Sequence, residues 1–260
     1  MRKNKAVTVD YISDLHLDFW IPFNPSQEKW ESRTKGYIEK LILGSKAGEI
    51  LCLAGDISHF NQQSYWALET FSKYYDLVYM VFGNHDYYLV SRNQSSKYKG
   101  NSMNRITELK EKCGHLDNIV FDGVIEYKDK TFCGITMWYP LTTLEQNNFF
   151  HSVSNDSVLI QGSNVSMLHC NDIKEYYNLP DIDVLITHVP IIHIDSHQKY
   201  KSTACYYTPV DELKAEYVIM GHSHERKIYS KPYGKFYMNA IGYPGEFKEL
   251  PTIKNFEVKK

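Results

Sequence analysis

Short apolar runs alternate with longer amphipathic stretches through the first third of the chain. The runs at 6–12, 50–54 and 77–82 are rich in valine, isoleucine and leucine, so they predict buried strands. The stretches at 27–43 and 64–75 lie between them and predict helices. Strand and helix in alternation favour right-handed crossovers and parallel pairing, which gathers the carboxyl ends of the strands at one edge.

The rest of the chain predicts a second group of strands. The segment 93–101 is rich in serine, lysine and asparagine, and it predicts a mobile surface loop. Helices are predicted at 105–113 and 166–177, and a hairpin of 119–127 with 131–138 could begin a second sheet. Further strands are predicted at 184–187, 217–220, 227–230, 235–241 and 252–258, the last three antiparallel. We expect one domain over residues 1–260.

Composition and charge narrow the range of functions. The chain is 43% hydrophobic and 23% charged, which is typical of a soluble globular protein. Its formal net charge of −2 excludes a globally basic surface that tracks nucleic acid phosphates, although a local basic patch stays open. Duplex nucleic acid is therefore a disfavoured partner, and the oligomeric state is left open.

The termini and the cysteines bear on location. No apolar stretch approaches the length needed to cross a bilayer, and the amino terminus lacks the pattern of a secretory signal. The cysteines are odd in number and lack CxxC spacing, so we expect buried reduced thiols at Cys52, Cys113, Cys133, Cys170 and Cys205. Together these features predict a cytoplasmic protein without a membrane partner.

Short polar clusters punctuate the chain in a fixed order, and at least three directly follow predicted strands. They are Asp14-Leu15-His16, Gly55-Asp56, Gly83-Asn84-His85-Asp86, Thr187-His188 and Gly221-His222-Ser223-His224. Each cluster alone has an ordinary interpretation as a helix cap or a turn. All five in this order at strand ends are very hard to obtain by accident, and together they supply oxygen and imidazole ligands for two divalent metals.

This set of residues suits hydrolysis of a phosphate ester. Two divalent ions about 3.5 to 4 Å apart bind phosphate oxygens and acidify a bridging water. A carboxylate has two oxygens and can bridge the ions, whereas a neutral imidazole cannot, so Asp56 is the candidate bridge. Asp14 and His16 are two positions apart, as are His222 and His224, so each pair can point the same way from an extended strand end.

The Asn84-His85-Asp86 cluster presents an amide oxygen, an imidazole and a carboxylate in succession. Three consecutive polar side chains cannot all be ligands of one centre. The middle residue, His85, is the natural free catalytic group. Asp86 is then available to orient it from outside the metal centre.

The five clusters together resemble the calcineurin-like metallophosphoesterase superfamily, whose pattern is D-x-H, GD, GNH[DE], H and GH-x-H. The match extends from Asp14 to His224. Ser13 to Leu17, Gly134 to Trp138 and the tail Asn239 to Tyr243 are similar to a bacterial branch of single-domain members. That branch usually has Asn-Pro-Arg-Gly-Tyr in the tail, and the arginine is missing here.

The resemblance implies an α/β sandwich of two central mixed β-sheets flanked by helices. It implies that the first metal is held by Asp14, His16, Asp56 and His224, and the second by Asp56, Asn84, His188 and His222. His85 would stabilise or protonate the leaving oxygen, with Asp86 supporting it. Nitrogen and oxygen ligation without thiolates suits Mn²⁺ best, with Fe, Zn, Co or Ni as alternatives.

Several other histidines carry weaker signals. His59 lies three positions after Asp56 and could contact substrate, although it could equally begin the next helix. His193 and His197 follow His188 in a loop that could line the cleft. His59 and His193 are therefore kept as weak substrate-binding candidates. No pattern surrounds the others, and we expect surface or packing roles for His115, His151 and His169.

The leading function is a dinuclear metal-dependent phosphoesterase, in which hydroxide held by the metals attacks a small phosphodiester or phosphomonoester. A nuclease is the alternative, disfavoured because little chain follows His224 for a DNA-facing domain. Protein Ser/Thr phosphatases are disfavoured because no arginine follows Gly55-Asp56-Ile57-Ser58. A non-catalytic binding scaffold is also possible, but such proteins usually lose ligands, and here all are present.

Overall fold

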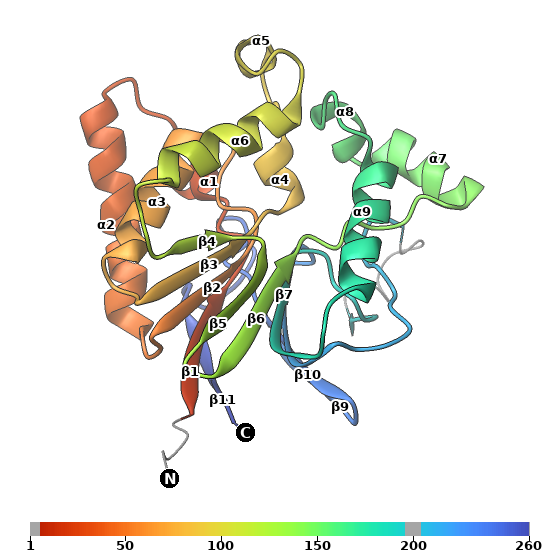
Figure 1. The fold of residues 1–260 in the computed structure, drawn as a ribbon. Helices are drawn as coiled ribbons and strands as arrows, with labels where there is room; N and C mark the ends of the chain where they lie inside the picture. Colours follow the sequence, from red (N-terminus) through yellow and green to blue (C-terminus); the bar gives the residue numbers. More distant parts are fainter. Residues whose placement is uncertain (1–5, 196–203, 260) are drawn as a thin grey trace.

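Two β-sheets pack face to face, with helices on their outer faces (Figure 1). The structure is a computed structural model and describes residues 6–195 and 204–259. Within these residues the first sheet has five strands in the order β11-β1-β2-β3-β4. Their bounds are Lys254–Val258 for β11, Val7–Ile12 for β1, Ile50–Ala54 for β2, Leu77–Val81 for β3 and Ile119–Phe121 for β4. Strands β1 to β4 run parallel, while β11 is antiparallel to β1.

The second sheet has, in the same described ranges, six strands in the order β5-β6-β7-β8-β10-β9. Their bounds are Gly123–Tyr127 for β5, Lys130–Ile135 for β6, Ile182–Thr187 for β7, Ala215–Met220 for β8, Gly234–Asn239 for β10 and Arg226–Lys231 for β9. The four inner strands run parallel, and both edge strands are antiparallel to their neighbours. The expected arrangement of two mixed sheets flanked by helices is confirmed.

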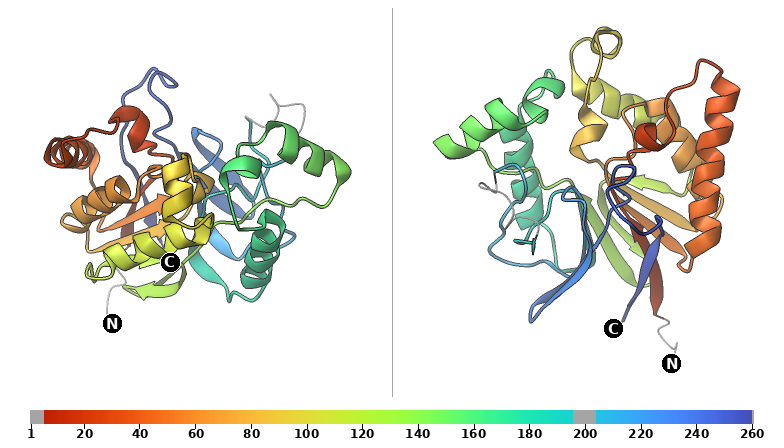
Figure 2. Two further views of the ribbon diagram at one scale, coloured as in Figure 1. Left: turned by 90° about the horizontal axis from the view of Figure 1, so that it is seen from above. Right: turned by 180° about the vertical axis from the view of Figure 1, so that it is seen from behind.

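The helices form the outer layers and the rim of the site. Their bounds are Leu17–Trp20 for α1, Gln27–Ser45 for α2, Asn61–Ser72 for α3, Asn84–Tyr87 for α4, Arg92–Lys97 for α5, Ser102–Cys113 for α6, Leu144–Val153 for α7, Asp156–Leu159 for α8 and Val165–Tyr177 for α9. Helices α2, α3 and α6 cover the first sheet, and α9 covers the second (Figures 1 and 2). Helices α4 and α5 rise above the first sheet, and α7 and α8 lie across from them on the side of the second sheet.

The strands of the first sheet are apolar on both faces because both faces are covered. Successive residues of a strand point to opposite faces. Leu51 and Leu53 of β2 accordingly belong to the core beneath the helices, whereas Ile50 and Cys52 belong to the core between the sheets. This double burial explains the continuous apolar runs in the sequence.

Parallel pairing brings the ends of the strands together at one edge. In the register of the first sheet, Ile12 of β1 lies beside Leu53 of β2, and Ala54 lies beside Val81 of β3. The two sheets also join at this edge, where Ser13 pairs with Ala240. Polar residues that follow the strands of either sheet therefore lie close to one another.

The predicted strand 119–127 is two strands in two sheets. Asp122 has a φ of 60° and Gly123 a φ of 80°, and these left-handed residues break the run. Strand β4 therefore ends in the first sheet, and the chain crosses to the second sheet as β5. The hairpin of β5 with β6 is confirmed. In the tail, β9 and β10 are antiparallel as predicted, but β11 leaves them and pairs with β1.

The predicted surface loop at 93–101 contains helix α5 instead. The side chain of Ser91 accepts a hydrogen bond from the backbone of Gln94 and so caps this helix. The side chain of Gln94 in turn donates to the backbone carbonyl of His59 over 2.7 Å. The polar composition that suggested a loop is equally compatible with a short exposed helix when a capping serine is present.

The cysteines are unpaired, as expected, but they are not all buried. Each of the cysteines is free of disulfide bonds, and four are buried. Cys170 on α9 is exposed, so the expectation of a buried thiol is wrong there. Within residues 6–195 and 204–259, no helix has the length and apolar character to cross a membrane.

Candidate metal centre

The five polar clusters lie together at the edge where the strands of both sheets end. A positive φ occurs at Asp14 (50°), His16 (43°), Asp56 (60°), His222 (68°) and His224 (47°). For residues other than glycine this conformation costs about 1 to 3 kcal/mol, and such strain is typical of functional sites. The strained residues are among those predicted to be metal ligands, so the fold holds their side chains in positions that relaxed loops would not favour.

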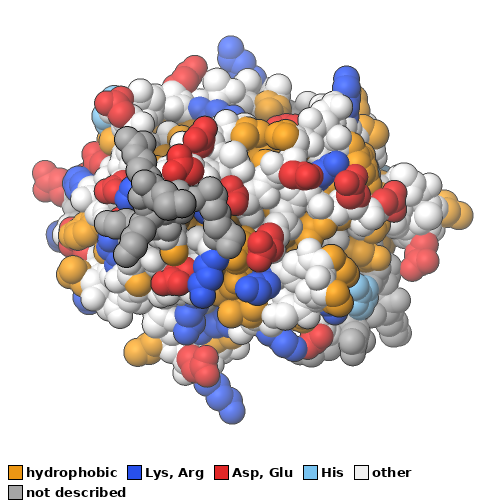
Figure 3. Space-filling view, turned by 60° about the horizontal axis from the view of Figure 1, so that its bottom comes forward, with side chains coloured by type: hydrophobic (Ala, Val, Ile, Leu, Met, Phe, Trp, Pro, Cys, Tyr) orange, Lys and Arg blue, Asp and Glu red, His pale blue; other side chains and the backbone are white. Residues whose placement is uncertain are grey.

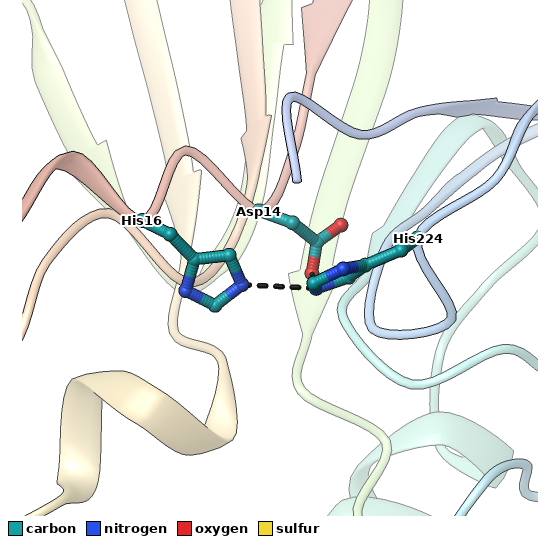
Figure 4. Close-up of side chains that lie close together, drawn as sticks. All are labelled: Asp14, His16 and His224. Atoms are coloured by element: carbon teal, nitrogen blue, oxygen red, sulfur yellow. Dashed lines mark hydrogen bonds and ion pairs between the residues drawn. The ribbon is translucent and has the colours of Figure 1, made fainter. Parts of the chain in front are cut away.

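The first group of candidate ligands consists of Asp14, His16 and His224 (Figure 4). One ligand atom from each lies within 4.8 Å of those from the other two. The Nε2 atoms of the two histidines face each other at 2.9 Å, and Nε2 of His224 lies 3.8 Å from Oδ1 of Asp14. Asp14 and His16 are buried. The three side chains come from the ends of β1 and β8, so the centre joins the two sheets.

The second group lies beside the first and contains Asn84, His188 and His222. Nε2 of His188 is 3.0 Å from Oδ1 of Asn84, and Nδ1 of His222 is 3.2 Å from the same oxygen. Asp56 lies between the two groups. Its Oδ2 is 3.9 Å from Nε2 of His16 and 3.5 Å from Nε2 of His188.

The charges of the site suit bound cations. Burial, followed by the nearby carboxylates of Asp86 and Asp14, raises the pKa of Asp56 well above its usual value. Burial and the neighbouring histidines, His85 first, lower the pKa of His16 well below its usual value. Burial likewise lowers the pKa of His188 and His222. The site thus combines crowded carboxylates with several imidazoles whose neutral form is favoured, and a divalent ion suits both. Nitrogen and oxygen donors without a thiolate fit a divalent first-row metal.

Backbone and side-chain acceptors fix the orientation of the histidine rings. Nδ1 of His188 is 2.8 Å from the carbonyl oxygen of Ala54, and Nε2 of His222 is 2.7 Å from that of Cys205. Each of these ring nitrogens donates, so the other nitrogen of the ring is left as an acceptor. That second nitrogen is the one that faces Asn84 in both cases.

Glu246 orients His224 in the same way. Its Oε2 lies 2.8 Å from Nδ1 of His224 and accepts the backbone N–H of Tyr243 over 2.8 Å. Burial alone would lower the pKa of His224, but the hydrogen bond to Glu246 and the charge of Asp14 raise it. The ring of Tyr243 stacks on His16 at 4.6 Å between centroids. The tail that lacks the expected arginine therefore supports the first group of ligands.

Glycines allow the loops to approach closely. A Cβ atom on Gly83 would lie 2.2 Å from Oδ1 of Asp56 and 2.6 Å from Cε1 of His188. Gly55 has a φ of 85°, and a Cβ atom there would lie 2.5 Å from Nδ1 of His188. Any side chain at these positions would push the proposed bridging carboxylate away from the imidazole.

Asp86 joins the loop that carries Asp56 to the loop that begins at Gly83. Its carboxylate accepts hydrogen bonds from the backbone N–H groups of Gly83 at 2.9 Å, Asp56 at 2.9 Å and Ile57 at 3.2 Å. The sequence predicted that Asp86 orients the ring of His85, but the ring is bonded by His59 instead. The reason is local, because the short helix α4 turns the Asp86 side chain back onto its own amino terminus.

His59 connects His85 to the carboxylate of Asp18, a residue that the sequence did not single out. Nδ1 of His85 is 2.8 Å from Nε2 of His59, and Nδ1 of His59 is 2.8 Å from Oδ2 of Asp18. Asp18 also accepts the backbone N–H of His59 at 3.1 Å. Asp18, His59 and His85 thus form a linear series of hydrogen bonds. One nitrogen of His85 lies within 4.8 Å of ligand atoms from His16 and Asp56.

Asp156 is a further residue that the sequence did not single out. It is buried, and its Oδ1 accepts a hydrogen bond from the amide nitrogen of Asn84 at 2.8 Å. The hydroxyl groups of Tyr88 and Tyr139 also donate to its carboxylate. Because a carboxylate accepts the amide N–H, the amide oxygen of Asn84 is directed toward the second group of ligands. Asp156 lies 72 positions from Asn84, and no sequence pattern connects them.

A cavity of about 330 Å³ opens onto the ligands. It is lined by Asp56, Asn84, His85, Tyr206, His222, Ser223, His224, Tyr243 and Glu246. His193 is outside this lining; it is exposed and packs edge-on against Tyr207 at 5.7 Å. His197 lies outside the described residues. The cavity therefore gives a substrate access to both groups of ligands and to His85.

Comparisons with known proteins agree with this geometry. The family model for calcineurin-like phosphoesterases matches residues 7–226. An uncharacterised protein of Acanthamoeba polyphaga mimivirus is 23% identical over an alignment of 216 positions, which covers 76% of this chain and 73% of that protein. Among solved structures, a phosphopantetheinyl hydrolase from Mycobacterium tuberculosis aligns with a TM-score of 0.72 at 16% identity, covering 97% of this chain and 96% of that one. This likeness is one of fold.

Asp56→Asn tests whether one carboxylate serves two ions. We expect the wild-type protein to hold two divalent ions per chain after loading with Mn²⁺, and the variant to hold fewer than two. The substitution replaces a charged group that faces both groups of ligands by a neutral amide. Elemental analysis after gel filtration measures the ratio. The exposed Asp117 gives the matched control, Asp117→Asn, which should keep both ions. At most one ion on the loaded wild-type protein would contradict a shared site.

Asp156→Asn tests the orientation of Asn84. We expect the second ion to bind about 10 to 100 times more weakly, because an outer partner that fixes a ligand is lost. Titration with Mn²⁺ measures the affinity, and circular dichroism checks that the variant is folded. Unchanged affinity for both ions in a folded variant would show that Asn84 does not depend on Asp156.

Proposed function

We propose that this chain, which belongs to the calcineurin-like phosphoesterase family, hydrolyses small phosphate esters at a centre of two metals. Membership of the family makes it a metal-dependent phosphoric ester hydrolase. The observation that carries the proposal is the position of Asp56, whose carboxylate faces ligands of both groups. A centre for one metal would not need a buried carboxylate between two sets of imidazoles. Mn²⁺ is the ion we infer, because the donors are nitrogen and oxygen atoms only.

We infer that the residues divide between the two ions as the resemblance to the family implies. Asp14, His16, Asp56 and His224 would hold the first ion, and Asp56, Asn84, His188 and His222 the second. When bound, such ions polarise the phosphoryl oxygens and lower the pKa of a bound water. The protein contributes the positions of the ligand atoms. Hydrogen bonds that the imidazoles donate to the carbonyl oxygens of Ala54 and Cys205 and to the carboxylate of Glu246 hold them in place.

His85 is placed to carry a proton for the leaving oxygen. An ionised carboxylate only accepts hydrogen bonds, so Asp18 requires the proton of His59 to lie on Nδ1. Nε2 of His59 then accepts from Nδ1–H of His85, and Nε2 of His85 is the nitrogen that gains and loses a proton. Burial and the neighbouring histidines, His59 first, lower the pKa of His85 well below its usual value, which favours the neutral ring. The negative charge of Asp18 at the end of this series acts in the opposite direction. His59 therefore supports His85, a role different from the substrate contact considered from sequence.

A small substrate fits the surroundings of the centre. The residues that line the cavity include acidic, imidazole and aromatic groups, and within the described part of the chain none of them is a lysine or arginine. Duplex DNA binding depends on neutralising several phosphates. Figure 3 shows the lower part of the molecule as drawn in Figure 1, away from the carboxyl ends of the strands, and basic and acidic side chains are interspersed there too. We therefore infer that the phosphoryl charge of one ester group is met at the metal centre.

The site does not favour the non-catalytic scaffold that the sequence alone left open. Its main argument would be the loss of a ligand or of the catalytic histidine. All seven residues proposed as ligands lie in one site here, and His85 lines the same cavity. Metal-dependent turnover of a chromogenic phosphodiester discriminates between the two functions.

A substrate panel tests the proposed activity. We expect the Mn²⁺-loaded protein to hydrolyse bis(p-nitrophenyl) phosphate, p-nitrophenyl phosphate or a cyclic nucleotide, and to cut linear duplex DNA poorly. The physical reason is the weak electrostatic attraction for several backbone phosphates. Turnover of 2′,3′-cyclic and 3′,5′-cyclic nucleotides is measured under the same condition. Efficient degradation of the duplex without activity on any small ester would favour the nuclease.

His85→Ala tests the proton carrier. We expect turnover to fall by about 10² to 10⁴ while both ions are retained, because a general acid is lost and no proposed ligand is. Asp18→Asn should lower turnover by less, since His85 and His59 remain. The exposed histidine His115 gives the control His115→Ala, which should keep full activity. Loss of the metals from a folded His85→Ala protein would show that His85 is a ligand instead.

A further inference from the structure

A second cavity adjoins the metal centre on the side of α7. Its volume is about 180 Å³, and it shares Asn84, Tyr206 and His222 with the larger cavity. Its remaining wall includes Tyr88, Phe149 and Val153. We call this cavity the side pocket. It opens beside the ligands of the second ion, so a group attached to the phosphorus can enter it directly.

The walls of the side pocket favour a flat, uncharged group. The rings of Phe149 and Tyr206 meet at 6.1 Å and 61°, and that of Tyr206 lies 6.1 Å from His222. The hydroxyl of Tyr88 already donates to Asp156 and accepts from the amide of Asn84, so it has no proton left for an occupant of the pocket. Asp156 also lines the pocket, and its buried carboxylate disfavours a second anionic group there.

The volume of the side pocket corresponds to about one ring. A protein cavity of roughly 150 Å³ lined by apolar side chains binds benzene. The side pocket has a similar volume of about 180 Å³. Aromatic walls bind rings through offset or edge-to-face contacts. A single six-membered ring therefore fills the space, whereas a methyl group leaves most of it unoccupied.

The position of His85 decides which ester group enters the side pocket. The His85 ring packs against His16 at 4.6 Å and against His59 at 4.9 Å, on the side of the first group of ligands. The side pocket lies against Asn84 and His222 of the second group. The ring centroid of Tyr88 lies 4.4 Å from that of His85, and Tyr88 also lines the side pocket. Tyr88 therefore stands between His85 and the side pocket. A leaving oxygen beside His85 and a group in the side pocket thus lie in different directions from the phosphorus.

We propose that the side pocket binds the ester group that stays on phosphorus, and that this group carries a single flat, uncharged ring. The proposal rests on the proposed function and narrows its substrate to phosphodiesters of that kind. Water adds to phosphorus, and the bond to the leaving oxygen breaks with its electron pair. One proton of the water ends on that oxygen, and the products are an alcohol and the phosphomonoester of the retained ring.

Two diesters that release the same product test the proposal. Phenyl p-nitrophenyl phosphate and methyl p-nitrophenyl phosphate both release p-nitrophenol and differ only in the retained group. We expect kcat/KM of the Mn²⁺-loaded protein to favour the phenyl ester by about tenfold or more, mainly through KM. The ratio of kcat/KM for the phenyl ester to that for the methyl ester is divided by the ratio of their uncatalysed hydrolysis rates. This correction removes the difference in chemical reactivity between the two esters.

Variants on α7 test whether the preference for the phenyl ester arises in the side pocket. Phe149→Ala should reduce the phenyl to methyl ratio to about threefold or less, because one wall of the side pocket is lost. Leu144 is on the same helix, is 77% exposed and lies outside the lining of the side pocket. Leu144→Ala should therefore keep the wild-type ratio. An equal loss in both variants would overturn the assignment.

An inhibitor pair provides a test that needs no variant. Phenylphosphonate carries its ring directly on phosphorus, and methylphosphonate is its small counterpart. We expect phenylphosphonate to inhibit the wild-type protein at least about ten times more strongly. Metal-dependent hydrolysis of both diesters at equal corrected kcat/KM, or equal inhibition, would overturn the side pocket and leave the proposed function intact. Hydrolysis of neither diester would overturn the side pocket, and only the additional failure of every small ester in the substrate panel would overturn the proposed function as well.

Discussion

The buried carboxylate of Asp56 is the constraint on which the rest of the site depends. It lies at the end of β2, with only 2% of its surface exposed, between the imidazoles of His16 and His188. Its Oδ1 accepts the backbone N–H of His85 at 2.8 Å, which leaves Oδ2 facing the imidazoles. A negative charge in such a place is expensive unless cations accompany it. The surrounding glycines, the strained loops and Asp86 all hold this carboxylate where it faces candidate ligands of both groups.

A buried arginine completes the support behind the catalytic side of the site. Arg105 on α6 donates to the backbone carbonyls of His85 and Tyr88 at 2.8 Å and of Ser58 at 2.6 Å. It thereby fixes α4 against the loop that carries His59. Helices α7 and α8 have the corresponding role on the other side. Asp156 accepts the amide N–H of Asn84, and Phe149 lines the side pocket, so one segment contacts both a candidate ligand and the side pocket.

The sequence predicted those parts of the structure that depend on local pattern. Apolar runs marked β1, β2 and β3, and polar clusters after strands marked the candidate ligands, because parallel strands must end at one edge. The break at Asp122 was missed because the run on either side of it is uniformly strand-like, and only the left-handed backbone reveals the change of sheet. Helix α5 was missed because its polar residues have no apolar period.

The supporting residues could not be found in this way. Asp18 lies 41 positions from His59, and Asp156 lies 72 positions from Asn84. Contacts at such separations leave no periodic trace in one sequence. The side pocket is equally invisible, because Phe149 and Tyr206 are ordinary aromatic residues until the fold brings their rings to 6.1 Å. Candidate ligands at the ends of strands can therefore be predicted from the sequence. The residues that orient these ligands, and the pocket beside them, are found only in the tertiary structure.

The central claim is that two metals share the Asp56 carboxylate. Anomalous diffraction from crystals grown with Mn²⁺ tests it most directly, since the ions are located without reference to activity. The account predicts two anomalous peaks about 3.5 to 4 Å apart, one on the His16 side of Asp56 and one on the His188 side. A single peak, or two peaks of which only one lies within bonding distance of Asp56, would contradict it.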